Sequence, residues 1–143
     1  MGFSREPAEH AIRLILSGLF DRFPKLTVDV GTFGRRPHDR SPADGPPTPA
    51  SIRYIAGKHR RPPSEYLREN FHVTTSGIFR TQALLNALLE VGADRILFAV
   101  DITFEAAREI ATWFDGCSIS ETDRAKIGRT NAARLFGMNA PKQ

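Results

Sequence analysis

The sequence alternates short strand-like runs with longer amphipathic stretches, and this alternation most constrains the fold. Strands are expected at 26–30, 71–75 and 96–100. The first two contain β-branched residues and end near glycine, and the third is a continuous apolar run. Such a run is typical of a strand buried on both faces of a parallel sheet. Strands that alternate with helices of ten or more residues indicate βα units, so the sequence predicts an α/β fold with a parallel sheet.

The stretches between the strands have helical periodicity and recognisable end signals. Pro7 suits a first helical turn and Pro24 ends the first helix. Ser120 with Asp123 resembles a capping box. We therefore expect helices at 7–22, at about 64–69, from Thr81 as N-cap to Val91 with Gly92 after it, at 104–115, after Ser120, and from Asn131 as N-cap to Gly137.

Length and composition narrow the class of protein. The 143 residues are 41% hydrophobic, which suits one globular domain and excludes a wholly disordered chain. The longest apolar run, 14–16, is far below the roughly 20 residues that a transmembrane helix needs. The N-terminus has no signal-peptide pattern, and the single cysteine excludes an internal disulfide. These features favour a cytoplasmic protein with no membrane partner.

The positive charge is concentrated in one irregular, proline-rich segment at 32–61. This segment has seven Lys or Arg residues against two acids and no helical or strand periodicity. Its basic residues could bind phosphate groups, but the only aromatic residues among them are Phe33 and Tyr54, and no nucleic-acid-binding motif is present. A solvated insert is the preferred interpretation, and no nucleic acid partner is expected.

Several stretches, in order and at consistent spacing, resemble one family. They are residues 9–26 (EHAIRLILSGLFDRFPKL), 61–66 (RPPSEY), 70–77 (NFHVTTSG), 92–101 (GADRILFAVD) and 131–137 (NAARLFG). Together they resemble the C-terminal half of amidohydrolase-related, metal-dependent decarboxylases. The γ-resorcylate, 2,3-dihydroxybenzoate and 5-carboxyvanillate decarboxylases are the nearest in pattern.

The resemblance implies the C-terminal portion of a (β/α)8 barrel, with residues 1–143 as a partial domain that supplies strands six, seven and eight. It also implies metal-dependent, nonoxidative decarboxylation of an aromatic or unsaturated carboxylic acid, with zinc or manganese as cofactor in the intact family. The family binds its metal through an acidic/His motif on strand one, a His after strand five and an Asp after strand eight. Only the last has a counterpart here, Asp101, so this chain alone could lack the metal.

Residues 32–57 match the family in length but not in amino-acid sequence. The family has Gly-His-x-Gly-Glu after strand six, where this chain reads Gly31-Thr32-Phe33-Gly34-Arg35. Threonine cannot exchange a proton near neutral pH as an imidazole does. We hypothesise that 32–57 are translated out of frame, which translation of the coding DNA in the other two frames would test.

Four residues are candidates for the site. The resemblance makes Asp101 a metal ligand and the group that protonates the ring carbon, and an Asp after a buried strand can also be a helix N-cap. Phe104 is a candidate to line an aromatic pocket, or packs in the core. His72 could contact substrate if it points into the barrel, and Arg80, otherwise a surface residue, could contact a carboxylate.

These features leave three hypotheses for function. The first is a decarboxylase that acts on a small carboxylic acid. The second is a truncated, inactive remnant whose open sheet edges make it self-associate as a homo-oligomer or require a complementary N-terminal half. The third is a basic nucleic-acid-binding protein.

Overall fold

The computed structural model of the chain describes residues 6–31, 60–77, 79–100 and 107–138. The irregular segment expected at 32–61 therefore lies almost entirely outside the described residues. Three strands form one sheet in the order β1-β2-β3: β1 Val28–Gly31, β2 Phe71–Thr74 and β3 Ile96–Leu97. Both neighbouring pairs are parallel. The prediction of a parallel α/β sheet is thus confirmed.

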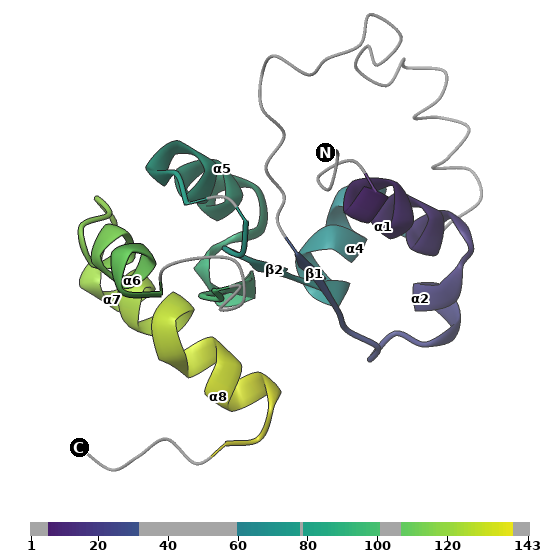
Figure 1. Ribbon diagram of the computed structural model, residues 1–143. Coiled ribbons are helices and arrows are strands. Elements are labelled where there is room, and N and C mark those ends of the chain that lie inside the picture. Colours follow the sequence, from purple (N-terminus) through teal and green to yellow (C-terminus); the bar gives the residue numbers. More distant parts are fainter. Residues whose placement is uncertain (1–5, 32–59, 78, 101–106, 139–143) are drawn as a thin grey trace, which may run out of the picture.

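The helices form two groups, one beside β1 and the other beside β3 (Figure 1). The group near β1 consists of α1 Glu6–Leu16, α2 Leu19–Arg22 and α4 Pro63–Asn70. The other group consists of α5 Thr81–Val91, η2 Ala93–Arg95, α6 Ala107–Asp115, α7 Glu121–Ala125, η3 Lys126–Thr130 and α8 Asn131–Leu135. Within the described part, no helix is both long and apolar enough to cross a membrane.

The helix expected at 7–22 is interrupted. Gly18 has φ of +73°, a left-handed conformation that favours glycine, and the chain turns there between α1 and α2. The turn brings Phe20 into the core with 1% of its surface exposed, whereas Phe23, which a continuous helix would have buried, is 50% exposed. The prediction of one continuous helix is therefore wrong, because the glycine allows the last turn to reorient toward the sheet.

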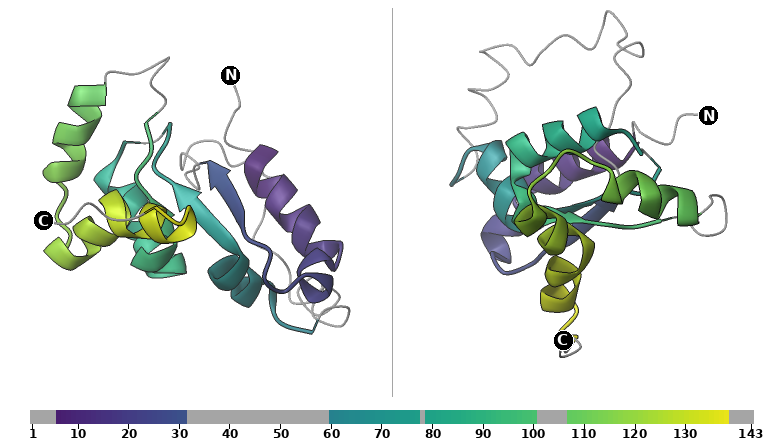
Figure 2. Two further views of the ribbon diagram at one scale, coloured as in Figure 1. Left: turned by 90° about the horizontal axis from the view of Figure 1, so that it is seen from below. Right: turned by 90° about the vertical axis from the view of Figure 1, so that its left-hand side faces the viewer.

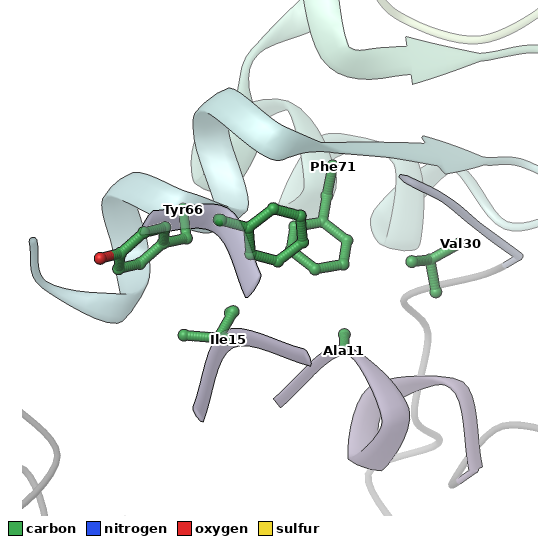
Figure 3. Packing of buried hydrophobic residues seen from close by; sticks show 6 residues of the cluster. Ala11, Ile15, Val30, Tyr66 and Phe71 are labelled. Atoms are coloured by element: carbon green, nitrogen blue, oxygen red, sulfur yellow. The ribbon is translucent and has the colours of Figure 1, made fainter. Parts of the chain in front are cut away.

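The first hydrophobic cluster joins α1, α2 and α4 to the sheet (Figure 3). The rings of Phe20 and Phe71 meet edge to face, with centroids 5.0 Å apart. Phe71 begins β2 and is fully buried. The buried members of this cluster are Ala11, Ile15, Phe20, Val30, Tyr66 and Phe71.

The second hydrophobic cluster joins α5, α6 and η3 to β3. The rings of Phe98 and Phe114 lie 4.6 Å apart between their centroids. Arg124 also donates hydrogen bonds to the carbonyl oxygens of Phe114 and Cys117, which closes the turn after α6. The buried members of this cluster are Leu84, Ile96, Phe114, Cys117 and Ile127.

The C-terminal helical run begins as predicted but continues differently. Ser120 is the N-cap of α7 and accepts a hydrogen bond from the amide of Asp123, which confirms the helix start predicted there. Asn131 was expected to cap a separate helix. The backbone of Thr130 and Asn131 is instead helical, so η3 leads directly into α8, and the Asn131 side chain is buried against β3. A cap needs non-helical backbone, so that prediction is wrong.

Candidate functional site

The carboxyl ends of the three strands lie at one edge of the sheet, because all three run in parallel. Barrel enzymes place their catalytic residues at this edge. The described chain continues from β3 to Val100, one residue before Asp101. Asp101 and Phe104, the two principal site candidates, lie outside the described residues. The described geometry therefore covers only the segment that precedes Asp101 in the sequence, up to Val100.

The segment that leads to Asp101 is anchored at three points. At its start, the Asn131 amide donates hydrogen bonds to the carbonyl oxygens of Ala93, at 2.7 Å, and Ile96, at 2.8 Å. In the middle, the Phe98 amide donates to the carbonyl of Ile127, at 2.9 Å.

The third anchor lies at the end of the segment. The Thr75 hydroxyl accepts a hydrogen bond from the Ala99 amide and donates one to the Ala99 carbonyl, each at 3.0 Å. Ala99, two positions before Asp101 in the sequence, is thus attached to Thr75, the residue that follows β2, next to the edge where the site is expected.

The sheet has an apolar face and a polar face. Strand pairing places Val30, Val73 and Ile96 on the same face, toward the helices of the two clusters. The opposite face carries Asp29 and His72, which are register partners, followed by Thr74 paired with Leu97. In a barrel, the face away from the helices is the interior.

His72 is buried on this polar face between two charged groups. Its Nε2 lies 3.4 Å from Nη1 of Arg95, and its Nδ1 lies 3.6 Å from Oδ1 of Asp29. Burial lowers the pKa of His72, and the positive charge of Arg95 lowers it further, while Asp29 opposes both. His72 is therefore neutral at physiological pH.

The contacts of His72 indicate which nitrogen carries the proton. A guanidinium only donates hydrogen bonds, so Nε2 of His72 accepts from Arg95 and the proton lies on Nδ1, facing Asp29. Nδ1 nonetheless has no hydrogen-bond partner among the described residues, and neither has Oγ1 of Thr74. The polar face thus carries two buried polar atoms that make no hydrogen bond within the described part of the chain.

Arg80 lies in different surroundings. It is the exposed N-cap residue of α5, after the C-terminal end of β2, whereas His72 is the second residue of that strand. Its carbonyl accepts the amide of Leu84, the first hydrogen bond of α5. The predicted cap residue Thr81 is instead the first helical residue. The described structure therefore does not bring His72 and Arg80 into one cluster.

Two grooves lie toward the amino ends of the strands. One, of about 220 Å³, lies between α4 and α5 and is lined by Leu67, Phe71, Val73 and Ala87 among others. The other, of about 340 Å³, is lined by Thr27, His72, Asp94, Arg95, Asn131, Arg134 and Leu135. Thr27 precedes β1 and Arg95 precedes β3, so the second groove does not mark the carboxyl edge of the sheet.

The described residues do not by themselves fit a metal ion. Among them, no group of three His, Cys, Asp or Glu side chains lies close enough to hold one. The Asp29 and His72 pair supplies only two such groups, and zinc sites usually use at least three protein ligands. A metal site in this protein therefore needs ligands beyond the described residues.

We did not predict from the sequence the hydrogen bonds that Thr75, Arg95 and Asn131 make. All three lie within motifs that carry the family resemblance, at 70–77, 92–101 and 131–137. A polar residue at the end of an expected strand was a usable signal for Thr75. Asn131 was predicted as a cap because asparagine is common at caps. Its side-chain amide can also donate two hydrogen bonds to carbonyl groups, and the prediction did not consider this.

Comparison with known proteins identifies the relatives of this chain. A γ-resorcylate decarboxylase of Rhizobium sp. (strain MTP-10005) is 46% identical over 96% of this chain. The crystal structure of a 2,6-dihydroxybenzoate decarboxylase in complex with 2,6-dihydroxybenzoate is 44% identical, with a TM-score of 0.76, and the match covers 96% of this chain and 43% of that one. A dihydroxybenzoic acid decarboxylase from Polaromonas sp. JS666, solved with manganese and 2-nitroresorcinol, is 40% identical with a TM-score of 0.76 over 96% of this chain and 42% of that one.

The length of the match and the family model complete the comparison. The chain spans 42% of the length of the Rhizobium relative, which agrees with a partial barrel. The sequence model of the amidohydrolase family matches residues 1–138, nearly the whole chain. Sheet topology, sequence identity and structural similarity agree, and the chain belongs to the amidohydrolase family.

Proposed function

We propose that this chain forms strands six to eight of a (β/α)8 barrel that catalyses nonoxidative decarboxylation of an aromatic carboxylic acid. The observation that carries the proposal is the anchored end of β3: Thr75 and Ile127 hold Ala99 and Phe98 just before Asp101. These contacts support the proposal because the described chain that precedes Asp101 ends near the carboxyl edge of a parallel sheet, where barrel enzymes carry their catalytic residues. The γ-resorcylate and dihydroxybenzoate decarboxylases among the relatives support this reaction class.

In this proposal Asp101 has two roles. Its carboxylate is one ligand of a divalent metal, zinc or manganese, which orients the oxygen atoms of the substrate when bound. Its carboxyl group also delivers a proton to the ring. The bond between the ring carbon and the carboxylate breaks, the electron pair of that bond takes the proton, and carbon dioxide leaves.

The other candidates have lesser parts in the proposal. Phe104, three residues after Asp101, lines the pocket for the aromatic ring, and Arg80 contacts a carboxylate group of the substrate. His72 remains a predicted substrate contact, although its burial between Asp29 and Arg95 favours a supporting role. The described residues lack a metal-binding trio, so the remaining ligands come from outside them.

The proposal is tested by an assay for decarboxylation. The 143-residue chain is supplied with Mn²⁺ and 2,6-dihydroxybenzoate, alone and together with the part of the Rhizobium relative that it does not match. We expect 1,3-dihydroxybenzene to form in the combined sample, and the Asp101→Asn variant to form at least about a hundredfold less, because general acid catalysis typically contributes that much. No product in either sample, or equal rates for wild type and Asp101→Asn, would contradict the proposal.

A second candidate is a truncated, inactive remnant of the family that self-associates through its open sheet edges. Two observations favour it: the described residues hold no metal-binding trio, and β1 and β3 each have only one neighbouring strand in the described sheet. In the same assay, this candidate predicts no product, either from the chain alone or together with the complementary part. Product in the combined sample would exclude it.

A further inference from the structure

Thr75 makes an unusual pair of hydrogen bonds. Its Oγ1 accepts from the amide of Ala99 and donates to the carbonyl of the same residue, each at 3.0 Å. A hydroxyl group can do both at once, because it has one donor and two acceptor positions. Thr75 thus provides Ala99 with the donor and the acceptor that a neighbouring strand would otherwise supply.

These two hydrogen bonds keep the chain after β3 attached to the chain after β2, beyond the last pair of strand residues. The β2–β3 ladder has only two register pairs, Val73 with Ile96 and Thr74 with Leu97. The amide of Thr75 then donates to the carbonyl of Leu97 at 3.1 Å. The hydroxyl of Thr75 makes the next hydrogen bonds, both with the backbone of Ala99. The chain therefore stays attached to β2 for two residues past the ladder.

Threonine suits this position for two physical reasons. Thr75 is only 6% exposed, so water competes poorly for its hydroxyl and the two hydrogen bonds are strengthened by the low local dielectric. Its β-branched side chain has restricted χ1 freedom, which fixes the direction of Oγ1. The neighbouring Thr74 lacks any hydrogen-bond partner for its hydroxyl within the described part.

We propose that Thr75 is a positioning residue for Asp101. By holding both polar groups of the Ala99 backbone, it sets the direction in which the chain leaves the sheet two residues before the carboxylate that the reaction uses. This inference rests on the proposed function for the role of Asp101, whereas the Thr75–Ala99 attachment stands on geometry alone. Thr75 itself touches neither substrate nor metal in this proposal.

The test uses three variants of the full chain. Thr75→Val has nearly the same shape and removes both hydrogen bonds, and Thr75→Ser keeps the hydroxyl. Thr74→Val is the matched control, since it removes a neighbouring hydroxyl that has no partner among the described residues. Amide hydrogen exchange at Ala99 reports the attachment directly. We expect protection to fall about tenfold in Thr75→Val, the loss expected for one hydrogen bond of ordinary strength, and to remain near wild type in the other two.

A second measurement reports the consequence at Asp101 without requiring activity. The carboxyl carbon of Asp101 is observed by NMR in the labelled chain. We expect one sharp signal for wild type and Thr75→Ser, and a broadened or multiple signal for Thr75→Val. Ser120→Ala, which removes the N-cap of α7, controls for general destabilisation and should leave the signal sharp. An unchanged Asp101 signal in Thr75→Val would overturn the positioning role, even if Ala99 lost protection.

Kinetics in the combined sample separate this inference from the proposed function. If wild type forms product, Thr75→Val should lower kcat at least about tenfold with little change in KM, because positioning acts on the geometry of the reacting groups. Thr75→Ser should keep kcat near that of wild type. Unchanged kcat in Thr75→Val would contradict the inference. If wild type forms no product, the proposed function fails while exchange and NMR still decide whether Thr75 positions Asp101.

Discussion

The two faces of the sheet are built from alternate residues of the same strands, yet they differ in chemistry. The helix-covered face carries Phe71 and Val73, which pack into apolar surroundings, while the opposite face carries Asp29, His72 and Thr74. Figure 2 shows the helices and the sheet from two further directions. The first face supplies the hydrophobic stability of the fold. The second keeps buried polar atoms without hydrogen-bond partners in the described part, as expected of a wall that faces a site.

The largest effect should follow from a change on the apolar face. Phe71→Ala removes a fully buried ring that meets Phe20 edge to face, and should lower the free energy of unfolding by about 3–5 kcal/mol, because it leaves a cavity. Urea denaturation measures this change. Phe136→Ala, at a position 61% exposed, is the control and should have little effect. Equal effects of the two variants would mean that the helix-covered face is not the stabilising one.

The next effect concerns the polar support of β3. Asn131→Ala leaves the carbonyl groups of Ala93 and Ile96 without their donor, and should lower the free energy of unfolding by about 1–3 kcal/mol. The same substitution at the exposed Asn86 of α5 should stay within about 0.5 kcal/mol. Thermal and urea unfolding both measure the difference. Similar results for the two asparagines would show that the buried hydrogen bonds of Asn131 are not stabilising.

A smaller effect should appear as a pH dependence of stability. Because folding lowers the pKa of His72, the unfolded chain binds its proton more tightly than the folded chain. The stability associated with neutral His72 is therefore complete above the unfolded pKa of about 6.5 and decreases as the pH falls below it. One group limits the slope to about 1.4 kcal/mol per pH unit.

Denaturation curves between pH 7.5 and 5.5 measure this dependence. The wild-type curve should be compared with that of His72→Gln, which should lose the contribution of this residue, and with that of His10→Gln, a change at an exposed position of α1. If His72→Gln kept the full wild-type pH dependence, His72 would not be the buried titrating group of the polar face.

The smallest effect should come from Asp29. Its carboxylate, 3.6 Å from His72 Nδ1 and 42% exposed, raises the pKa of His72 against the effect of burial. Asp29→Asn should change stability by about 0–1 kcal/mol at pH 7.5, since exposed pairs contribute little. At pH 5.5 the variant should be less stable relative to wild type, because protonated His72 loses its negative partner. High salt should reduce this difference, and its absence at low salt would argue against the Asp29–His72 interaction.

Much of the architecture was predictable because it depends on local periodicity. The strand at 96–100 was recognisable from its apolar run, although the regular strand is only Ile96–Leu97. Beyond the regular strand, Ala99 is held by the Thr75 hydroxyl, a side-chain contact that no propensity describes. Gly18 lies inside the helix expected at 7–22, and its turn was not predicted because its left-handed conformation depends on where Phe20 packs.

For the candidate site, sequence alone identified Asp101 by its position after a buried strand and by family resemblance. It could not distinguish a substrate contact from a supporting role for His72, since that depends on residues far apart in the chain. Asp29 precedes His72 by 43 positions, and Arg95 follows it by 23. Strand register alone brings Asp29 and His72 together.

By itself, the sequence determined the order of strands and helices and the parallel sense of the sheet. Periodicity, turn residues and continuous apolar runs act over a few neighbouring positions, so they can be read directly. Only the tertiary structure decided that Asn131 holds the start of β3 and Thr75 its end, because hydrogen-bond partners distant in sequence meet only after the strands have paired.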